Sequence, residues 1–184
     1  MKNKDLDLLL KKMKMGNEDA FVELYNATKK GLFAFIYTYL NNYQDSEDIL
    51  LETFIKIRSN IQRYKDNTNP TAWMFQIAKN EALNYINKNK RVEYVDFQEN
   101  VSIAGNYEMD VEGKQILEIT IKVLSQEEAR IVLLHAVDGY KHQEISKILN
   151  MPLGTVLWKY NKAIKTLQEA LGEYRWKRKK YSKN

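Results

Sequence analysis

Apolar residues recur at helical spacing through much of the first half of the chain. In 18–40, "EDAFVELYNATKKGLFAFIYTYL", the apolar positions begin at Phe21 and Leu24, and Asn17 in front of them is a suitable N-cap. The segment 44–64, "QDSEDILLETFIKIRSNIQRY", has the same period. Because no useful stretch alternates as a strand would, we predict two helices here.

A third helix is expected after the polar turn 66–70, "DNTNP". Asn69 followed by Pro70 is a typical helix start, because asparagine can cap the first turn and proline needs no amide hydrogen there. The helix is expected to run to about Asn89. Only 7 glycines and 2 prolines occur in 184 residues, so few helix breakers interrupt these segments.

The pattern changes at 92–113, "VEYVDFQENVSIAGNYEMDVEG", which is acidic, contains glycine and loses the helical period. This composition predicts a flexible linker. A helix is expected to resume near Lys114. Ser125 with Glu128 three residues later then form a capping-box signature before the next apolar run.

Two short amphipathic segments joined by a tight turn follow in 139–167, "GYKHQEISKILNMPLGTVLWKYNKAIKTL". Pro152 cannot continue the first of them. Each segment has an apolar face suited to a core, made of Ile145, Ile148 and Leu149 in the first and of Val156, Tyr160, Ala163 and Leu167 in the second. This arrangement predicts a helix-turn-helix, whose second helix can enter a DNA major groove. A helical hairpin with a solvated basic face is the alternative.

The outer face of that second helix is basic and carries a large aromatic residue. It comprises Leu157, Trp158, Asn161, Lys162 and Lys165, with Lys159 beside it. Lysines there would release counterions from DNA phosphates on binding. Trp158 could contact DNA or fold back onto the core.

These elements predict an all-α protein with two small helical domains, 1–91 and 114–184. A flexible acidic linker, 92–113, joins them, and the C-terminal domain is the helix-turn-helix. The net charge is +5, and positive charge gathers in 56–91 and 129–184. Such segregation favours two surfaces that face a polyanion.

Composition argues against several other classes of protein. Cysteine is absent, which excludes disulfides and thiolate chemistry and fits a reducing compartment. Charges interrupt the N-terminal apolar runs, so no signal peptide is expected, and the longest apolar stretch, 31–40, is half a membrane span. His135 and His142 lack partners at metal-ligand spacing, and no glycine-rich phosphate loop occurs. We therefore expect a cytoplasmic protein without enzymatic activity, cofactor, metal or membrane insertion.

Three carboxylates share one face of the second predicted helix. Asp45, Asp48 and Glu52 lie at i, i+3 and i+7. The pattern fits a solvated acidic face, a catalytic site or a docking surface for a basic partner, and it does not separate them.

The third predicted helix carries a stripe that is a poor core face. Its members are Trp73, Ile77, Asn80, Asn84 and Asn87. Aromatic rings can stack on unpaired bases and amides can bind their edges, so the stripe suits single-stranded nucleic acid. Nearby positive charge comes from Lys79, Lys88, Lys90 and Arg91. The alternative is a buried Trp73 beside solvated amides.

Two segments together resemble a known family. "DSEDILLETFIKIRSNIQRY" and "NPTAWMFQIAKNEALNYINKNKR" resemble the second conserved region of bacterial RNA polymerase sigma factors. "LSQEEARIVLLHAVDGYKHQEISKILNMPLGTVLWKYNKAIKTL" resembles their fourth region. The order, the acidic spacer and the short chain are similar to the extracytoplasmic-function (ECF) group. The resemblance covers about 10–90 and 115–170.

The resemblance implies partners and roles for individual residues. It implies binding to core RNA polymerase and to promoter DNA, and, as in many members of the group, to an anti-sigma factor. The polymerase-docking residues would be Asp45, Asp48, Leu51 and Glu52. The residues that capture the −10 strand would be Asn67, Trp73, Lys79, Asn80, Asn84 and Lys88. The −35 element would be read by Thr155, Leu157, Trp158, Lys159, Asn161 and Lys162.

The chain departs from the family pattern at two places. Leu51 stands where the family usually has a polar residue, so the docking face is more apolar. Leu157, Trp158 and Lys159 stand where many members have a basic residue, serine and arginine. Lysine cannot make the bidentate contact of arginine with guanine, so the family's −35 preference does not carry over.

A stand-alone helix-turn-helix regulator is the alternative function. Its N-terminal half would be a dimerisation or sensing module, and it would bind a palindromic site without polymerase. The acidic face and the aromatic–amide stripe argue against it, because a sensor module needs neither.

Overall fold

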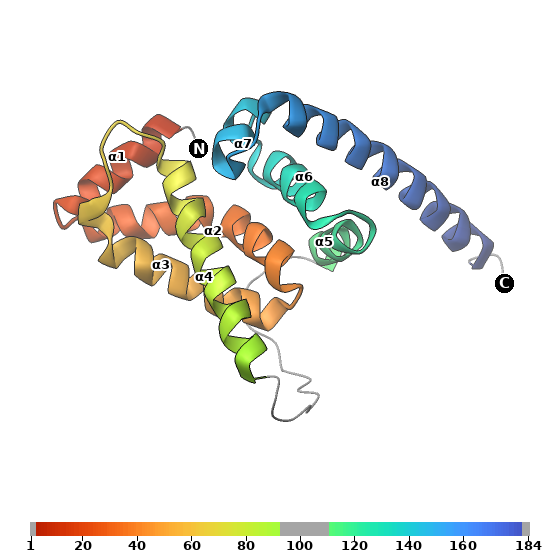
Figure 1. The fold of residues 1–184 in the computed structure, drawn as a ribbon, viewed down its shortest axis with the longest axis horizontal. Coiled ribbons are helices and arrows are strands. Elements are labelled where there is room, and N and C mark those ends of the chain that lie inside the picture. Colours follow the sequence, from red (N-terminus) through yellow and green to blue (C-terminus); the bar gives the residue numbers. More distant parts are fainter. Residues whose placement is uncertain (1–2, 93–110, 182–184) are drawn as a thin grey trace. The chain divides into compact units, whose positions relative to one another are not determined.

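The computed structural model describes residues 3–92 and 111–181, and within these ranges it contains helices and turns but no strand (Figure 1). The chain divides into two compact units, Met1–Tyr107 and Glu108–Asn184. The predicted all-α class with two helical units is therefore confirmed.

The first unit is a bundle of four α-helices. They are α1 (Asn3–Lys14), α2 (Glu18–Leu40), α3 (Tyr43–Ser59) and α4 (Pro70–Val92), with a 3-10 turn at Ile61–Arg63 between α3 and α4. The long α2 contacts each of the other three α-helices. Its middle is buried on several sides because Leu32, Phe33 and Ile36 are all fully covered.

Caps define the helix starts in this unit as the sequence predicts. The Asn17 side chain accepts a hydrogen bond from the Ala20 amide at 2.9 Å, which begins α2. The Asn69 side chain accepts one from the Ala72 amide at 3.0 Å at the start of α4. Each cap satisfies an amide that the first helical turn would leave without a partner.

The second unit consists of α5 (Val111–Val123), α6 (Gln126–Asp138), α7 (His142–Leu149) and α8 (Leu153–Tyr181). The predicted capping box is present, because the Ser125 and Glu128 side chains each bond the other's backbone amide. The predicted core face of α8 is also confirmed, since Val156 and Ala163 are fully buried. Tyr160 and Leu167 pack around the same core.

The structure differs from the sequence prediction at several boundaries. The single helix expected at 44–64 ends at Ser59, and α8 extends well beyond the predicted helix-turn-helix, to Tyr181. Helix α1 was not predicted. Its signal was present, because the buried residues Leu6, Leu9, Leu10 and Met13 recur at helical spacing. Residues 93–110 of the predicted linker lie outside the described residues.

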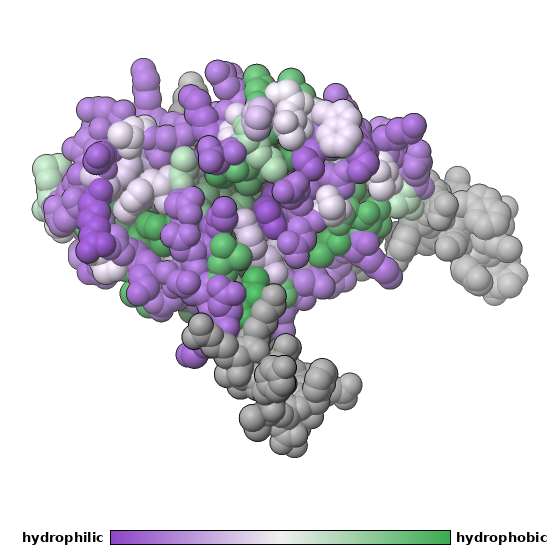
Figure 2. Space-filling view, viewed as in Figure 1, coloured by the Kyte–Doolittle hydropathy of each residue, from purple (hydrophilic) through white to green (hydrophobic). Residues whose placement is uncertain are grey.

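The surface is mainly hydrophilic on the face drawn in Figure 2, where apolar side chains show as separate areas. Among the described helices, none is both long enough and apolar enough to cross a membrane. The largest exposed apolar side chains of the first unit include Leu8, Met15, Val22, Leu51 and Ile55.

Two substitutions in α2 test which of its faces holds the first unit together. Leu24 is 0% exposed and Val22 is 57% exposed. We expect Leu24→Ala to lower the free energy of unfolding by about 2–5 kcal/mol, because it leaves a cavity. Val22→Ala should change it by less than about 0.5 kcal/mol. Urea unfolding followed through amide NMR signals of α2 measures both, and equal losses would contradict the packing described.

Candidate nucleic-acid and protein interfaces

The outer face of α3 combines acidic and apolar side chains. Asp48 is exposed, and Glu52 Oε1 lies 3.6 Å from Lys56 Nζ one turn further on. Leu51 and Ile55 are 54% and 59% exposed. Because residues four apart share a helix face, Asp48 with Glu52 and Leu51 with Ile55 form two adjacent strips. We call these four residues the α3 face.

Asp45 is oriented differently from the other predicted docking residues. Its carboxylate bonds the Tyr85 side chain of α4, and burial together with this bond raises the pKa of Tyr85. The structure therefore brings Asp48, Leu51 and Glu52 together and turns Asp45 toward α4. Sequence reasoning missed Ile55, although its position one turn after Leu51 was a signal.

The predicted amide stripe on α4 is exposed. Asn80 and Asn84 both face solvent, as do Lys79 and Lys88. Asn80 Oδ1 accepts a hydrogen bond from Gln76 Nε2 at 2.8 Å, which orients the Asn80 amide. These side chains are therefore placed for contact with a ligand.

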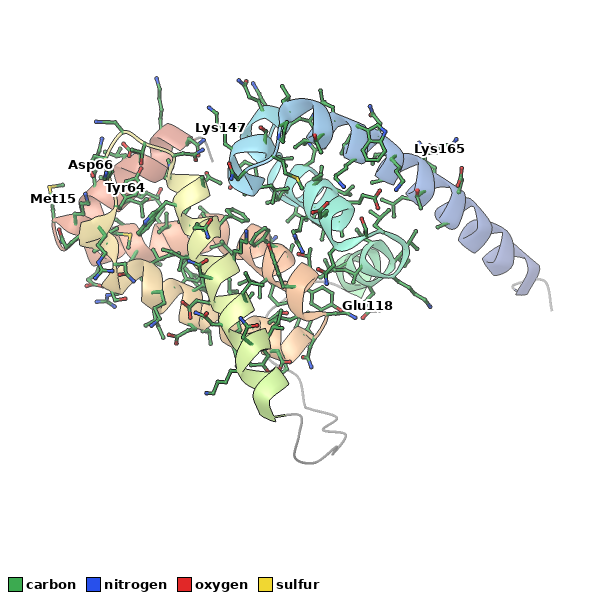
Figure 3. The ribbon with its side chains drawn as sticks, viewed as in Figure 1. Met15, Tyr64, Asp66, Glu118, Lys147 and Lys165 are labelled. Atoms are coloured by element: carbon green, nitrogen blue, oxygen red, sulfur yellow. The ribbon has the colours of Figure 1, made fainter. Side chains whose placement is uncertain are left out.

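Trp73 lies at the start of α4 and is half-buried. Its ring packs against Tyr64, with 5.1 Å between ring centroids. Tyr64 begins the loop 64–69, which contains the exposed Asn67. Figure 3 shows Tyr64 and Asp66 of this loop beside α1. Trp73 and Asn67 therefore belong to one local structure around Tyr64.

Helices α7 and α8 form the predicted helix-turn-helix. Asn150 ends α7 in the left-handed conformation with φ 51°, and the Met151 amide donates to the Ser146 carbonyl at 2.9 Å. The Pro152 carbonyl accepts from the Thr155 and Val156 amides, which begins α8. The short turn thus reverses the chain between two helices that pack on each other.

The exposed side of α8 contains most of its predicted DNA-facing residues. Trp158 is 60% exposed and Leu157 is 40% exposed, so Trp158 does not fold back onto the core. Asn161 and Lys162 are exposed and Thr155 is half-buried. Lys165 projects from the same helix (Figure 3).

Two lysines on α8 are already paired with carboxylates of α6. Lys159 Nζ lies 2.8 Å from Glu127 Oε2. Lys162 Nζ lies 2.9 Å from Glu128 Oε1. Both ammonium groups also lie 5.7 Å from the centroid of the Trp158 ring. DNA phosphates would therefore compete with these carboxylates for the two lysines, a feature that the sequence analysis did not predict.

The Glu128 carboxylate is the more strongly held of the two. Hydrogen bonds from Ser125 and Lys162 lower the pKa of Glu128 to about 2. A hydrogen bond from Lys159 also lowers the pKa of Glu127. Both carboxylates therefore stay ionised at neutral pH and keep their lysines paired.

The two histidines, which lack partners at ligand spacing in the sequence, contact each other in the fold. The His135 and His142 rings stack with 4.8 Å between centroids, and Tyr160 packs edge-on against both. His135 Nδ1 lies 2.8 Å from the Tyr140 carbonyl oxygen. Within the described ranges, no three potential ligands gather where they could hold a metal ion. The pair contributes to packing of the helix-turn-helix.

Comparison with known families matches both units. Residues 24–92 match the family model described as sigma-70 region 2, and residues 114–167 match the one described as sigma-70, region 4. The chain is 26% identical over 176 residues to the ECF RNA polymerase sigma factor SigW of Bacillus subtilis (strain 168), covering 88% of this chain and 94% of that protein. It is 24% identical over 163 residues to the ECF RNA polymerase sigma-E factor of Escherichia coli (strain K12), covering 81% and 85%.

Solved structures share the fold. The chain is similar to CnrH, solved in complex with the cytosolic domain of CnrY, with a TM-score of 0.66 and 17% identity over 92% of this chain and 98% of that one. It is also similar to the sigma factor RpoE of Bartonella quintana, solved in complex with the anti-sigma factor NepR. That match has a TM-score of 0.64 and 22% identity over 83% of this chain and 96% of the other.

The lowered pKa of Glu128 predicts how the second unit responds to acid. A group with a depressed folded pKa stabilises the fold above its unfolded pKa, and the stabilisation is lost as pH falls through the folded value. We expect the free energy of unfolding to drop between about pH 4.5 and about pH 2.

Glu128→Gln should remove that part of the pH dependence, whereas Glu169→Gln, at an exposed position of α8, should keep it. Urea unfolding at a series of pH values, followed through amide NMR signals of α6, measures the difference. Parallel curves for the wild type and Glu128→Gln would show that Glu128 is not held as described.

Proposed function

The chain belongs to the sigma-70 family of RNA polymerase sigma factors as a member of the ECF type, and we propose that its two units divide the promoter between them. Residues 1–91 would bind core RNA polymerase and capture the −10 strand. Residues 114–184 would place α8 on the −35 element. The alternative of a stand-alone regulator is not favoured, because both sigma regions match in the family's order.

The exposed α3 face is the observation that carries the docking proposal. Leu51 and Ile55 leave more than half of their surface in water, whereas Leu50 and Phe54 of the same helix are buried in the core. A partner helix that covers both would gain the burial of two large apolar side chains. Asp48 and Glu52 beside them would attract a basic partner and set its orientation.

For the −10 element, the proposed surface is the loop 64–69 with the exposed side of α4. Capture of an unpaired base costs a few kcal/mol for unstacking, which aromatic and amide contacts can offset. Trp73 supplies the aromatic surface, while Asn67, Asn80 and Asn84 supply amides. Lys79 and Lys88 are exposed and would contact phosphates.

For the −35 element, the proposed reader is the exposed side of α8, with Trp158 at its centre. Leu157 and Trp158 suit an apolar contact such as a thymine methyl. The described face includes Thr155, Asn161 and the two paired lysines, Lys159 and Lys162. We expect charge to contribute less to DNA binding by α8 than its lysine content suggests, because carboxylates of α6 neutralise Lys159 and Lys162.

The proposed role is one of binding rather than catalysis. The protein would contribute no chemical step of its own and would act in the cytoplasm, where polymerase and promoter DNA are found. RpoE of Bartonella quintana, whose fold this chain shares, was solved with an anti-sigma factor. We propose that a similar inhibitor binds this protein and competes with polymerase for the first unit or with DNA for the second.

A pair of matched substitutions tests the docking proposal. Ile55→Glu places a charge on the α3 face, and Leu8→Glu makes the same change at a 53% exposed position on α1. We expect Ile55→Glu to weaken binding to core RNA polymerase by at least about tenfold, because the apolar contact is lost. Leu8→Glu should bind as the wild type does.

Surface-immobilised core polymerase titrated with each full-length variant gives the affinities. If Ile55→Glu binds as tightly as the wild type, the α3 face is not the docking surface. If both variants lose affinity equally, the effect comes from added negative charge rather than from this face.

The pairing of Lys159 with Glu127 predicts an unusual response to salt. Glu127→Gln frees Lys159 for a phosphate, so duplex −35 DNA should bind more tightly. The plot of log affinity against log salt concentration should steepen by about 0.9, the value for one additional phosphate contact. Glu169→Gln removes a negative charge elsewhere on α8 and should leave the slope unchanged.

Fluorescence anisotropy with the holoenzyme and a labelled upstream promoter fragment measures the slope. An unchanged slope for Glu127→Gln would mean that Lys159 reaches phosphate in the wild type despite its ion pair.

A further inference from the structure

The loop 64–69 is held by a helix outside the matched family region. The match to sigma-70 region 2 begins at residue 24, whereas α1 spans Asn3–Lys14. We propose that Asp7 and Lys11 of α1 are positioning residues that fix how Asn67 is presented to the promoter strand. This inference rests on the proposed strand-capture role. Within that role, it says which residues determine the base that Asn67 prefers.

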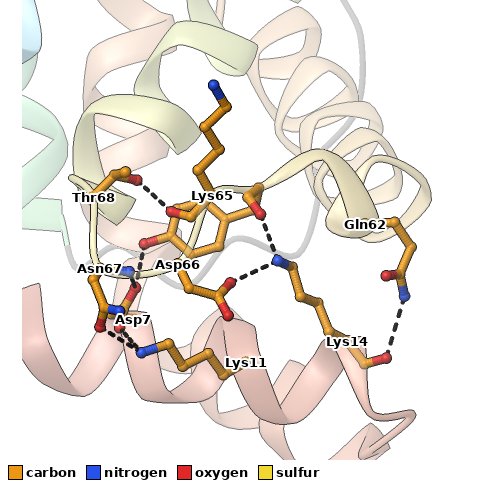
Figure 4. Close-up of polar contacts among 9 residues, drawn as sticks. Asp7, Lys11, Lys14, Gln62, Lys65, Asp66, Asn67 and Thr68 are labelled. Atoms are coloured by element: carbon orange, nitrogen blue, oxygen red, sulfur yellow. Dashed lines mark hydrogen bonds and ion pairs between the residues drawn. The ribbon is translucent and has the colours of Figure 1, made fainter.

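Asp7 joins α1 to the loop through two hydrogen bonds and pairs with Lys11 on its own helix. Its Oδ1 accepts from the Tyr64 hydroxyl at 2.6 Å and from the Asn67 backbone amide at 2.9 Å. Its Oδ2 lies 2.7 Å from Lys11 Nζ. Burial alone would raise the pKa of Asp7, but the hydrogen bonds from these three residues outweigh it and lower the pKa. The carboxylate is therefore ionised and fully engaged at neutral pH (Figure 4).

The backbone at Asn67 needs this support. Its φ is 58°, in the left-handed region that residues with a Cβ rarely adopt. Asparagine tolerates that region better than most residues, at a cost on the order of 1 kcal/mol. In this conformation the Asn67 amide donates to Asp7, and that bond offsets part of the cost.

Lys11 then fixes the direction of the Asn67 side chain. Lys11 Nζ donates to Asn67 Oδ1 at 2.7 Å. An ammonium group is a donor only, so the amide must turn its oxygen toward Lys11 and its NH2 group away. That NH2 group makes no hydrogen bond to any described residue, and the Asn67 side chain is exposed. The loop therefore offers a hydrogen-bond donor, and a base that presents an acceptor is its complement.

The remaining contacts hold the chain on the N-terminal side of Asn67. Lys14 Nζ donates to the Tyr64 carbonyl and lies 2.6 Å from Asp66 Oδ1. Gln62 Nε2 donates to the Lys14 carbonyl at 3.2 Å. Figure 4 shows these bonds reaching from one face of α1 to the loop. Helix α1 thus holds the loop at Tyr64, Asp66 and Asn67 rather than at one point.

The contacts of Lys11 indicate that it positions Asn67 rather than attracting DNA phosphates by its charge. Lys11 is already bound by Asp7 and Asn67, so it is not a free cation for phosphate. Lys12, the next residue, makes no side-chain hydrogen bond or ion pair with the described loop residues. Lys12→Met therefore removes the same charge from the same helix and leaves the contacts of Asp7, Lys11 and Asn67 in place. It is the matched control for Lys11→Met.

The test measures base preference position by position. Holoenzyme made with each full-length variant is incubated with single-stranded DNA that carries a randomised segment, and the bound fraction is sequenced. Lys11→Met should relax the preference at one position by roughly three- to tenfold, the effect of one lost hydrogen bond, and leave the other positions unchanged. Lys11→Arg keeps a donor for the amide and should retain the wild-type profile, as should Lys12→Met.

The variant Asn67→Asp provides a second, independent test of the same proposal. The carboxylate can still accept from Lys11, but its outer atom is now an acceptor, so the preferred base at that position should change to one that presents a donor. Thermal unfolding of each variant shows whether the fold is intact. The bonds from Tyr64 and Asn67 to Asp7 remain in Lys11→Met, so we expect this variant to fold, with a lower melting temperature because Asp7 loses its ion pair. Asn67→Asp keeps Lys11, and its base preference is compared with that of the wild type at a temperature at which all variants are folded.

The outcomes are distinguishable. An unchanged profile for Lys11→Met, or an equal decline at every position for Lys11→Met and Lys12→Met, overturns the positioning role while leaving strand capture intact. If wild-type holoenzyme enriches no sequence at all, the proposed strand capture itself fails and this inference fails with it. A changed preference at one position in both Lys11→Met and Asn67→Asp supports the assignment.

Discussion

The buried carboxylate of Asp7 is the interaction on which the loop 64–69 of the first unit depends. A charge removed from water is costly unless it is paired and hydrogen-bonded, so its partners must be in place whenever the unit is folded. Those partners are Lys11 on its own helix and Tyr64 and Asn67 on a loop 57 and 60 positions away. Because Tyr64 also packs on Trp73, the same carboxylate influences the start of α4.

The second unit uses carboxylates in a comparable way. Glu127 and Glu128 of α6 bind the lysines that flank Trp158 on α8, which leaves the indole exposed between two neutralised cations. If α8 binds DNA as proposed, the DNA must displace these carboxylates before it can contact the lysines. Charge would then contribute less to the affinity, and the shape around Trp158 would contribute more. In both units, carboxylates of a neighbouring helix thus determine which polar and charged groups of the proposed interfaces remain unpaired.

The sequence predicts what local chemistry determines and misses what distant contacts determine. The caps at Asn17, Asn69 and Ser125 each act within a few residues, so their signals could be recognised, as could the core face of α8. The ion pair of Lys159 with Glu127 joins two helices and has no local pattern. The orientation of Trp158 depended on how the unit packs, and periodicity alone left it open. The roles of the three proposed surfaces stay predictions.

The most direct test of the account is a map of transcript starts made by core RNA polymerase with the purified protein on fragments of the host genome. The account predicts discrete starts, each preceded by two elements at a fixed spacing, and none with core polymerase alone. Absence of such starts, together with tight binding to a palindromic duplex without polymerase, would contradict it and favour a stand-alone regulator.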